Sequence, residues 1–193
     1  VPNRVVFNTG DRCLSGTCQP LNSTNKANWP DVPFDLICAS GTDCTSWSPS
    51  FFSTVRLTGI EAQQYNTATS AYEKVDSYAL AHTMPATGDG TSPTLWLGSI
   101  IRTGHDTSAG GSTSAISLPS VSFTGIKLAN RVDTTGGLPN FYRQRIATIT
   151  TESGSVISPS YELPSACAAP VTTDPATNTK SCYPVFWTPD GYT

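Results

Sequence analysis

Apolar and polar residues alternate most regularly between Val75 and Met84. One face of this stretch would carry Tyr78, Leu80, His82 and Met84, and the other would carry Ser77, Ala79, Ala81 and Thr83. The period is two residues, as in a β-strand, and not the 3.6 residues of a helix. The pattern therefore predicts a strand with one apolar face.

The same reasoning predicts further strands along most of the chain. They are expected at Arg4–Asn8, Phe51–Ile60, Leu95–Thr103, Ala115–Leu118, Val121–Leu128, Tyr142–Glu152 and Ser155–Tyr161. The polar residues 61–72 are interpreted as an extended hairpin loop, and a second hairpin is expected to turn at Ser153-Gly154. Pro159 places the last of these strands at a sheet edge, because proline donates no backbone hydrogen bond. No window predicts a helix.

These elements predict an all-β fold, either an antiparallel β-sandwich or a curved sheet of about eight to ten strands. The 193 residues suit a single β module. Residues 1–50 form its loop-rich, cystine-pinned N-terminal part, residues 51–163 its strand core, and residues 164–193 a cystine loop with a terminal strand. Frequent Ser, Thr, Gly and Pro with only 13% charged residues agree with exposed strands and turns.

Charge and hydropathy exclude two classes of partner. The net charge is −3, and the eleven Lys and Arg are scattered, so no basic stripe is present to bind nucleic acid. No apolar run approaches the roughly 20 residues of a membrane span. The first residues do not form a signal peptide, so the signal of an exported protein would lie upstream.

Six cysteines, at positions 13, 18, 38, 44, 167 and 182, predict disulfides. The simplest pairing is sequential: Cys13–Cys18, Cys38–Cys44 and Cys167–Cys182, although six cysteines allow 15 connectivities. A zinc site is the alternative, but the spacings differ from the usual Cys-x2–4-Cys pairs and no histidine lies near. Disulfides place the protein in an oxidising compartment, and we expect it to be secreted or attached to the cell surface.

No set of residues marks a catalytic centre, a metal site or a cofactor site. His82 falls on the apolar face of its strand, and His105 stands beside Asp106 at a strand end, where a surface turn is the simpler interpretation. Asp89 in Gly88-Asp89-Gly90-Thr91 lacks the alternating acidic ligands of a calcium loop. The carboxylates Asp133, Glu152 and Glu162 show no pairing of the kind that glycosidases require.

Three tryptophans are the candidate binding residues. Trp29, Trp47 and Trp187 lie in loop or terminal regions beside prolines or cystines. Exposed tryptophans offer flat surfaces on which sugar rings stack. Small loops also bury an aromatic residue as a plug in place of a core. The sequence favours the plug, and it leaves the sugar-binding platform open.

Several stretches resemble the large secreted RHS/YD-repeat proteins of Gram-positive bacteria, in the region ahead of the tyrosine-aspartate repeats. The stretches follow the same order along nearly the whole chain. They are Asp11-Arg12-Cys13-Leu14, Trp29-Pro30-Asp31 through Cys38, Val75-Asp76-Ser77-Tyr78 through His82-Thr83, Gly88-Asp89-Gly90-Thr91, Thr103-Gly104-His105, Asn130-Arg131-Val132-Asp133-Thr134, Ile149-Thr150-Thr151-Glu152, and Cys182-Tyr183-Pro184-Val185 with Trp187-Thr188-Pro189.

The resemblance implies a part of a polymorphic-toxin or teneurin-like shell, in which a long β-wrapped cage encloses a variable C-terminal segment. We therefore expect a non-catalytic scaffold that braces or closes the shell, with neighbouring β domains of the same chain as its partners. A carbohydrate-binding module that attaches the parent to a polysaccharide is the first alternative. A hydrolase such as a glycosidase is the second. No cofactor is expected.

Overall fold

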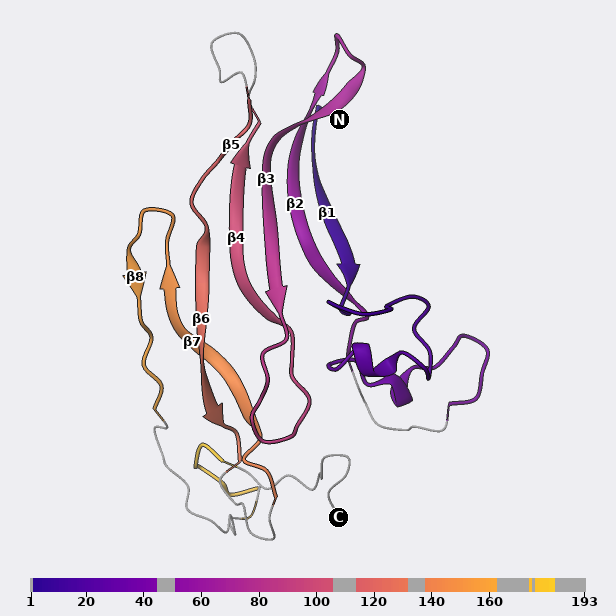
Figure 1. Cartoon of the computed structure of the whole chain (residues 1–193), viewed down its shortest axis with the longest axis vertical. Helices are drawn as coiled ribbons and strands as arrows, with labels where there is room; N and C mark the ends of the chain where they lie inside the picture. The colour runs from indigo at the N-terminus through magenta and orange to yellow at the C-terminus, as the bar shows by residue number, and fades with distance from the viewer. Residues whose placement is uncertain are drawn as a thin grey trace.

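The computed structural model describes residues 2–44, 51–105, 114–131, 138–162, 174 and 176–182. These residues are almost entirely β. Eight strands form one antiparallel sheet in the order β1-β2-β3-β4-β6-β7-β8, with β5 paired to β4 (Figure 1). The strands are β1 (Asn3–Asp11), β2 (Val55–Asn66), β3 (Ala71–Thr83), β4 (Trp96–Gly104), β5 (Ile116–Ser117), β6 (Val121–Ala129), β7 (Tyr142–Thr150) and β8 (Val156–Ile157).

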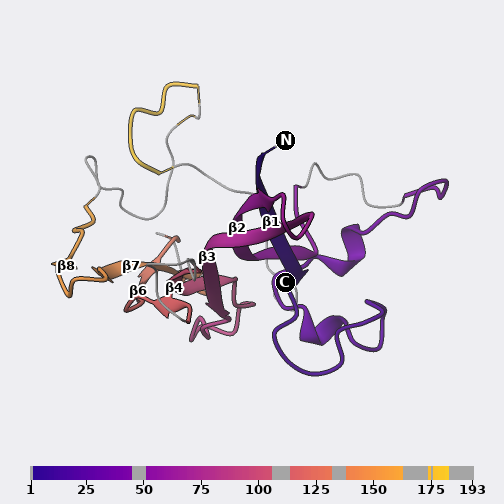
Figure 2. The ribbon, with the colours of Figure 1, turned by 90° about the horizontal axis from the view of Figure 1, so that it is seen from above.

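The predicted all-β fold is confirmed, in the form of a curved sheet. Seen from above, the described strands follow one another in a single bent row from β1 to β8 (Figure 2). The helical content of the described residues is two single turns of 3₁₀ helix, η1 (Lys26–Asn28) and η2 (Phe34–Leu36). The described strands therefore form one layer rather than the two packed layers of a sandwich.

The β2–β3 hairpin differs from its prediction. Residues 61–72 were expected to form a loop, but β2 continues to Asn66 and β3 begins at Ala71. Tyr65 lies opposite Tyr72, and their rings meet edge to face at 5.2 Å. The Arg4 guanidinium lies 3.9 Å above the Tyr72 ring. Cross-strand contacts of this kind stabilise these two strand ends, although their sequence lacks the alternation of apolar and polar residues that predicts a strand.

The last hairpin agrees with its predicted turn but has a shorter second arm. The chain turns at Ser153-Gly154, where Gly154 has a φ of 84°, a left-handed conformation that favours glycine. β8 ends after Ile157, two residues before Pro159, and it forms one edge of the sheet. Proline cannot donate to a neighbouring strand, so its position is consistent with the end of pairing there.

Residues 12–44, which we call the N-terminal loop region, form a small body beside the end of β1 (Figure 1). The disulfides Cys13–Cys18 and Cys38–Cys44 are present, as predicted. Cys182 is also disulfide-bonded, and its predicted partner Cys167 lies outside the described residues. The predicted terminal strand after residue 182 also lies outside them.

The only cluster of buried apolar side chains in the described part of the chain lies in this loop region. Trp29 is 1% exposed and packs with Cys13 and Val32, and Cys18 and Leu21 contact the cluster. The Trp29 Nε1–H donates to the backbone oxygen of Cys18 at 3.2 Å. This small core holds the loop region together, whereas the described strands have no buried core of their own.

Candidate interaction surface

The strand register places large apolar side chains on one face of the sheet. Phe7 pairs with Ile60, and Ile60 pairs with Tyr78. Directly paired residues point to the same side of a sheet, as do alternate residues of one strand. The ten large apolar side chains of the surface that we call the apolar face are Val5, Phe7, Ile60, Tyr78, Leu80, Ile100, Val121, Phe123, Ile149 and Ile157. The same face also carries the ion pair between Arg102, which lies opposite Tyr78, and Asp76.

None of these ten side chains is buried. Phe7 is 65% exposed, Val5 58% and Ile157 55%, and the others are half-buried between their neighbours. Scattered apolar side chains on a surface are ordinary, but a contiguous row across a whole sheet marks an interaction surface. No other described segment covers this face with a second layer.

The opposite face carries most of the polar side chains, together with the apolar Val6, Ile101 and Val156, and several of its polar side chains bond to each other across strands. Hydroxyl pairs join Thr103 to Ser117 at 2.8 Å and Thr124 to Thr148 at 2.6 Å. The Arg4 Nε–H donates to Gln63 Oε1 at 2.7 Å. Cross-strand pairs of this kind suit a face that meets water, because they leave the surface polar. Antiparallel sheets with one mainly apolar and one mainly polar face usually pack the apolar face against another layer and expose the polar face to water.

An open groove of about 480 Å³ lies at the β1 end of the sheet. Ala62 lies in the middle of β2, opposite Val5 on one side and Asp76 on the other, and its small side chain leaves space between them. β3 bulges at Val75 beside the groove. A large apolar side chain from a neighbouring element would fit this hollow. The lining residues are Asn3, Arg4, Val5, Ala62, Gln63, Gln64 and Val75.

The predicted tryptophan candidates do not form a described binding face. Trp29 is the aromatic plug of the N-terminal loop region, and its buried ring has no face free to stack on a sugar. Trp47 and Trp187 lie outside the described residues. Trp96 on β4 was not a candidate; its Nε1–H donates to the Phe123 backbone oxygen at 3.3 Å and links β4 to β6.

His82 lies on the apolar side of β3, as its sequence pattern predicts. It pairs with Leu97 of β4, and its Nδ1 lies 3.4 Å from Arg56 Nη1. Burial lowers the pKa of His82, and the positive charge of Arg56 lowers it further. Both effects favour the neutral imidazole.

His105 forms a contact that the sequence did not reveal. Its Nε2 lies 2.7 Å from Ser77 Oγ, and its backbone N–H donates to the Val75 oxygen at 2.9 Å. A serine nucleophile also needs a group that orients the histidine and donors for an oxyanion. The carboxylate adjacent to Ser77 belongs to Asp76, and Arg102 binds both of its oxygens. The described residues hydrogen-bond no carboxylate to His105; Asp106 lies outside them.

Asp89 connects the β3–β4 loop to the start of β7 through hydrogen bonds of its carboxylate. Its Oδ1 accepts from the Thr91 N–H and hydroxyl at 3.2 and 2.6 Å, and its Oδ2 accepts from the Tyr142 N–H at 2.8 Å. Burial alone would raise the pKa of Asp89, but these hydrogen bonds outweigh it and hold the pKa well below its usual range. The carboxylate serves as a turn acceptor, in agreement with the turn interpretation of Gly88-Asp89-Gly90-Thr91.

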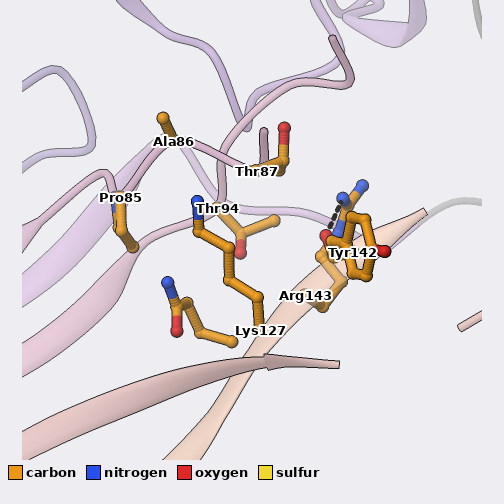
Figure 3. Close-up of a pocket in the computed structure, with 8 residues that line it drawn as sticks. Pro85, Ala86, Thr87, Thr94, Lys127, Tyr142 and Arg143 are labelled. Carbon is orange, nitrogen blue, oxygen red and sulfur yellow. Dashed lines mark hydrogen bonds between the residues drawn. The ribbon is translucent and has the colours of Figure 1, made fainter. Parts of the chain in front are cut away.

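A small cavity beside this turn has a volume of about 10 Å³, room for about one water molecule. The Lys127 side chain extends from β6 toward the loop, and an Arg143 N–H donates to the Tyr142 backbone oxygen at 2.7 Å (Figure 3). A cavity of this size accepts no larger ligand. Its lining consists of Pro85, Ala86, Thr87, Thr94, Lys127, Tyr142, Arg143 and Gln144.

The Asp89→Asn substitution is expected to cost about 1–3 kcal/mol of folding stability, because the amide offers one acceptor oxygen in place of two. Since the folded pKa of Asp89 lies below its ordinary value of 3.8, its contribution is complete above that pH and is lost as the pH falls further. Urea unfolding between pH 7 and pH 3 should show a smaller acid-induced loss in the variant. Equal pH profiles for wild type and variant would refute this role. Asp43→Asn, at an exposed carboxylate, is the control.

Carboxylates and metal ligands do not gather elsewhere in the described residues. No three His, Cys, Asp or Glu side chains in that part of the chain lie close enough to hold a metal ion. Glu162 is exposed, Glu152 is half-buried in the β7–β8 turn, and Asp133 lies outside the described residues. No helix among the described segments has the length and hydropathy required to span a membrane.

The apolar face is thus the most extensive candidate site in the described residues. Its ten members are apolar side chains, and no group of three or more metal-ligating side chains lies on it among the described residues. No family model, curated protein or solved structure matches this chain.

Proposed function

We propose that this chain is a non-catalytic structural β module that docks its apolar face against neighbouring β-elements of a larger secreted RHS/YD-repeat protein. In that position it braces or closes the β shell. The observation that carries the proposal is the row of ten apolar side chains across the sheet, none of them buried. The resemblance of the sequence to RHS/YD-repeat proteins supplies the proposed neighbour.

The physical reason for docking is the hydrophobic effect. Complete burial of a Phe, Ile or Val side chain stabilises by about 1.5–3 kcal/mol relative to its exposed state. Phe7, Val5 and Ile157 have most of that gain still available, and the half-buried members have a part of it. A second sheet about 10 Å above the first is the usual way to bury such a face. The groove over Ala62 would receive one of its larger side chains.

Two further observations support a structural role outside the cell. The disulfides Cys13–Cys18 and Cys38–Cys44 are typical of oxidising compartments and restrict the opening of the N-terminal loop region. The His82 and His105 side chains make contacts typical of structural residues, and neither borders a described ligand-sized cavity. The buried Trp29 gives the carbohydrate-binding alternative no support.

Hydroxyl-radical footprinting of the aromatic side chains tests this proposal. Oxidation of Phe7, Tyr78 and Phe123 is compared in the isolated 193-residue chain and in the parent protein that contains it. We expect these three rings, on the apolar face, to be oxidised several-fold more slowly in the parent. Tyr65 and Tyr72, on the polar face of the β2–β3 hairpin, are the matched controls and should change little.

Equal oxidation of the apolar-face rings in both contexts would contradict the docking proposal. A Phe123→Lys substitution provides a second measurement, because a lysine in the middle of a buried face leaves an unpaired charge. In the parent protein it should restore rapid oxidation of Tyr78. Protection of Tyr78 that persists in the variant would indicate that another surface makes the contact.

A further inference from the structure

The two edges of the sheet differ in the protection that they have against pairing with another strand. β8 is two residues long and is followed by Pro159, and the Tyr161 hydroxyl donates to the Ile146 backbone oxygen at 3.0 Å. β1 is nine residues long and contains neither proline nor lysine. Short strands, prolines and lysines are the usual devices that block edge pairing. The β8 edge therefore has such protection, and the β1 edge lacks it.

Two backbone hydrogen bonds at residues that flank β1 show which of its backbone groups point outward. The Tyr65 N–H donates to the Pro2 oxygen at 2.8 Å, and the Arg12 N–H donates to the Thr54 oxygen at 3.0 Å. Residues 2 and 12 therefore bond toward β2, and the alternation of an antiparallel ladder assigns the even-numbered residues between them to the same side. The backbone groups of Asn3, Val5 and Phe7 then point away from the sheet.

The outward edge has a defined length. Arg56 Nε–H donates to the Asp11 backbone oxygen at 2.9 Å, so the outward carbonyl at that end of β1 is already bonded. The extra residue of the β1–β2 bulge belongs to β2, where Thr58 falls between the partners of Asn8 and Thr9. β1 itself is thus regular from residue 3 to residue 9, which gives a partner strand a regular edge to pair with.

We propose that β1 pairs antiparallel with β1 of a second copy of this chain. The strand is complementary to itself when Val5 lies opposite the partner subunit's Phe7. In this register Asn3 faces the partner's Thr9, and Arg4 faces the partner's Asn8. Apolar residues meet apolar residues, polar residues meet polar ones, and no like charges lie opposite each other.

Neighbouring registers are less favourable. If Phe7 lay opposite the partner's Phe7, Asn3 would face the partner's Asp11, whose carbonyl is bonded to Arg56. If Val5 lay opposite the partner's Val5, the polar Asn3 would face the apolar ring of the partner's Phe7. In the proposed register, Val5 and the partner's Phe7 both direct their backbone N–H and C=O groups toward the other chain. The apolar faces of the two copies then lie on the same side of one continuous sheet. The pairing does not rest on docking of that face.

Sedimentation velocity over a concentration series tests the pairing. The wild-type chain should form a dimer, and Val5→Pro should be monomeric, because the proline removes an N–H that points outward. Val6→Pro is the matched control: its N–H points toward β2, so it should lower the melting temperature far more than Val5→Pro. A monomeric wild type throughout the series, or a Val5→Pro chain that still dimerises, would overturn the proposal.

Charge exchange tests the register itself. A chain with Val5→Lys and Phe7→Lys should be monomeric, as should a chain with Val5→Glu and Phe7→Glu, because like charges would lie opposite each other. Mixing the two should restore a one-to-one dimer that weakens as salt is added. Failure of the mixture to dimerise would refute this register. A dimer lost in Phe123→Lys but kept in Val5→Pro would assign the association to the apolar face and refute edge pairing.

Discussion

Replacing Trp29 with alanine is expected to open the N-terminal loop region while the sheet remains folded. Trp29 is the largest side chain of the small cluster with Cys13 and Val32, and it is 1% exposed. Truncation of a buried tryptophan costs about 3–5 kcal/mol, because the transfer free energy is lost and a cavity remains. The substitution also leaves the Cys18 carbonyl without the indole donor. A region with so few buried contacts has no other core to compensate.

Amide hydrogen exchange measures this effect locally. The Val32 N–H donates to the Trp29 oxygen at 3.0 Å and the Asn28 N–H to the Asn25 oxygen at 2.9 Å, so both amides report on the loop region. Their protection should fall by two orders of magnitude or more in Trp29→Ala, since about 1.4 kcal/mol corresponds to a factor of ten. Amides of β3 should change little. Ile37→Ala, at a side chain that is 42% exposed, is the control. Unchanged protection of Val32 would contradict the plug role.

Local sequence patterns predicted the strands because each pattern lies within one strand. Alternation around Tyr78, Leu80 and His82 predicted the face of β3, and the observed register places all three on the apolar side. The turn at Ser153-Gly154 was predicted for the same reason, since its chemistry is local. These features required no knowledge of which strand lies beside which.

The features that the sequence did not reveal depend on contacts between distant residues. The extension of β2 through Tyr65 relies on Tyr72 and on Arg4 from another strand. The contact between Ser77 and His105 arises because residue 77 pairs with residue 103, two positions before the histidine. The alternation of apolar and polar residues also does not reveal whether a second layer packs on the apolar face, because the pattern is the same in a sandwich and in a single sheet.

The uncovered face and the unprotected β1 edge have one physical consequence in common. Each would be stabilised by a second structural element. On the face, that element would bury apolar side chains, and at the edge it would pair with backbone donors and acceptors. They lie roughly perpendicular to each other, so a partner on the face does not compete with a strand at the edge. Phe7 contributes to both, its ring to the face and its backbone to the edge.

Replacing Asp31 with alanine is expected to detach the N-terminal loop region from the loop that precedes β4. Asp31 Oδ2 accepts from the Arg12 guanidinium and from the Leu95 N–H, the latter at 3.0 Å. The Asp31 side chain is 3% exposed, so this acceptor is buried. Removing one partner of a buried ion pair costs about 3–5 kcal/mol, because the remaining groups lose their compensation. Asp31→Asn should cost less, since its amide oxygen still accepts from Leu95.

A double-mutant cycle with Arg12→Gln separates the ion pair from the backbone contact. The free energy of unfolding, measured in urea, should fall strongly in each single variant. The double variant Arg12→Gln/Asp31→Ala should lose clearly less than the sum of the two, because the second substitution removes a group that the first has already left unpaired. Arg102→Gln is the matched control: its Asp76 pair lies elsewhere, on the exposed surface of β3 and β4, so it should be additive with Asp31→Ala. Additive losses for Arg12 and Asp31 would show that the two residues stabilise the chain independently and that their ion pair contributes no coupling energy.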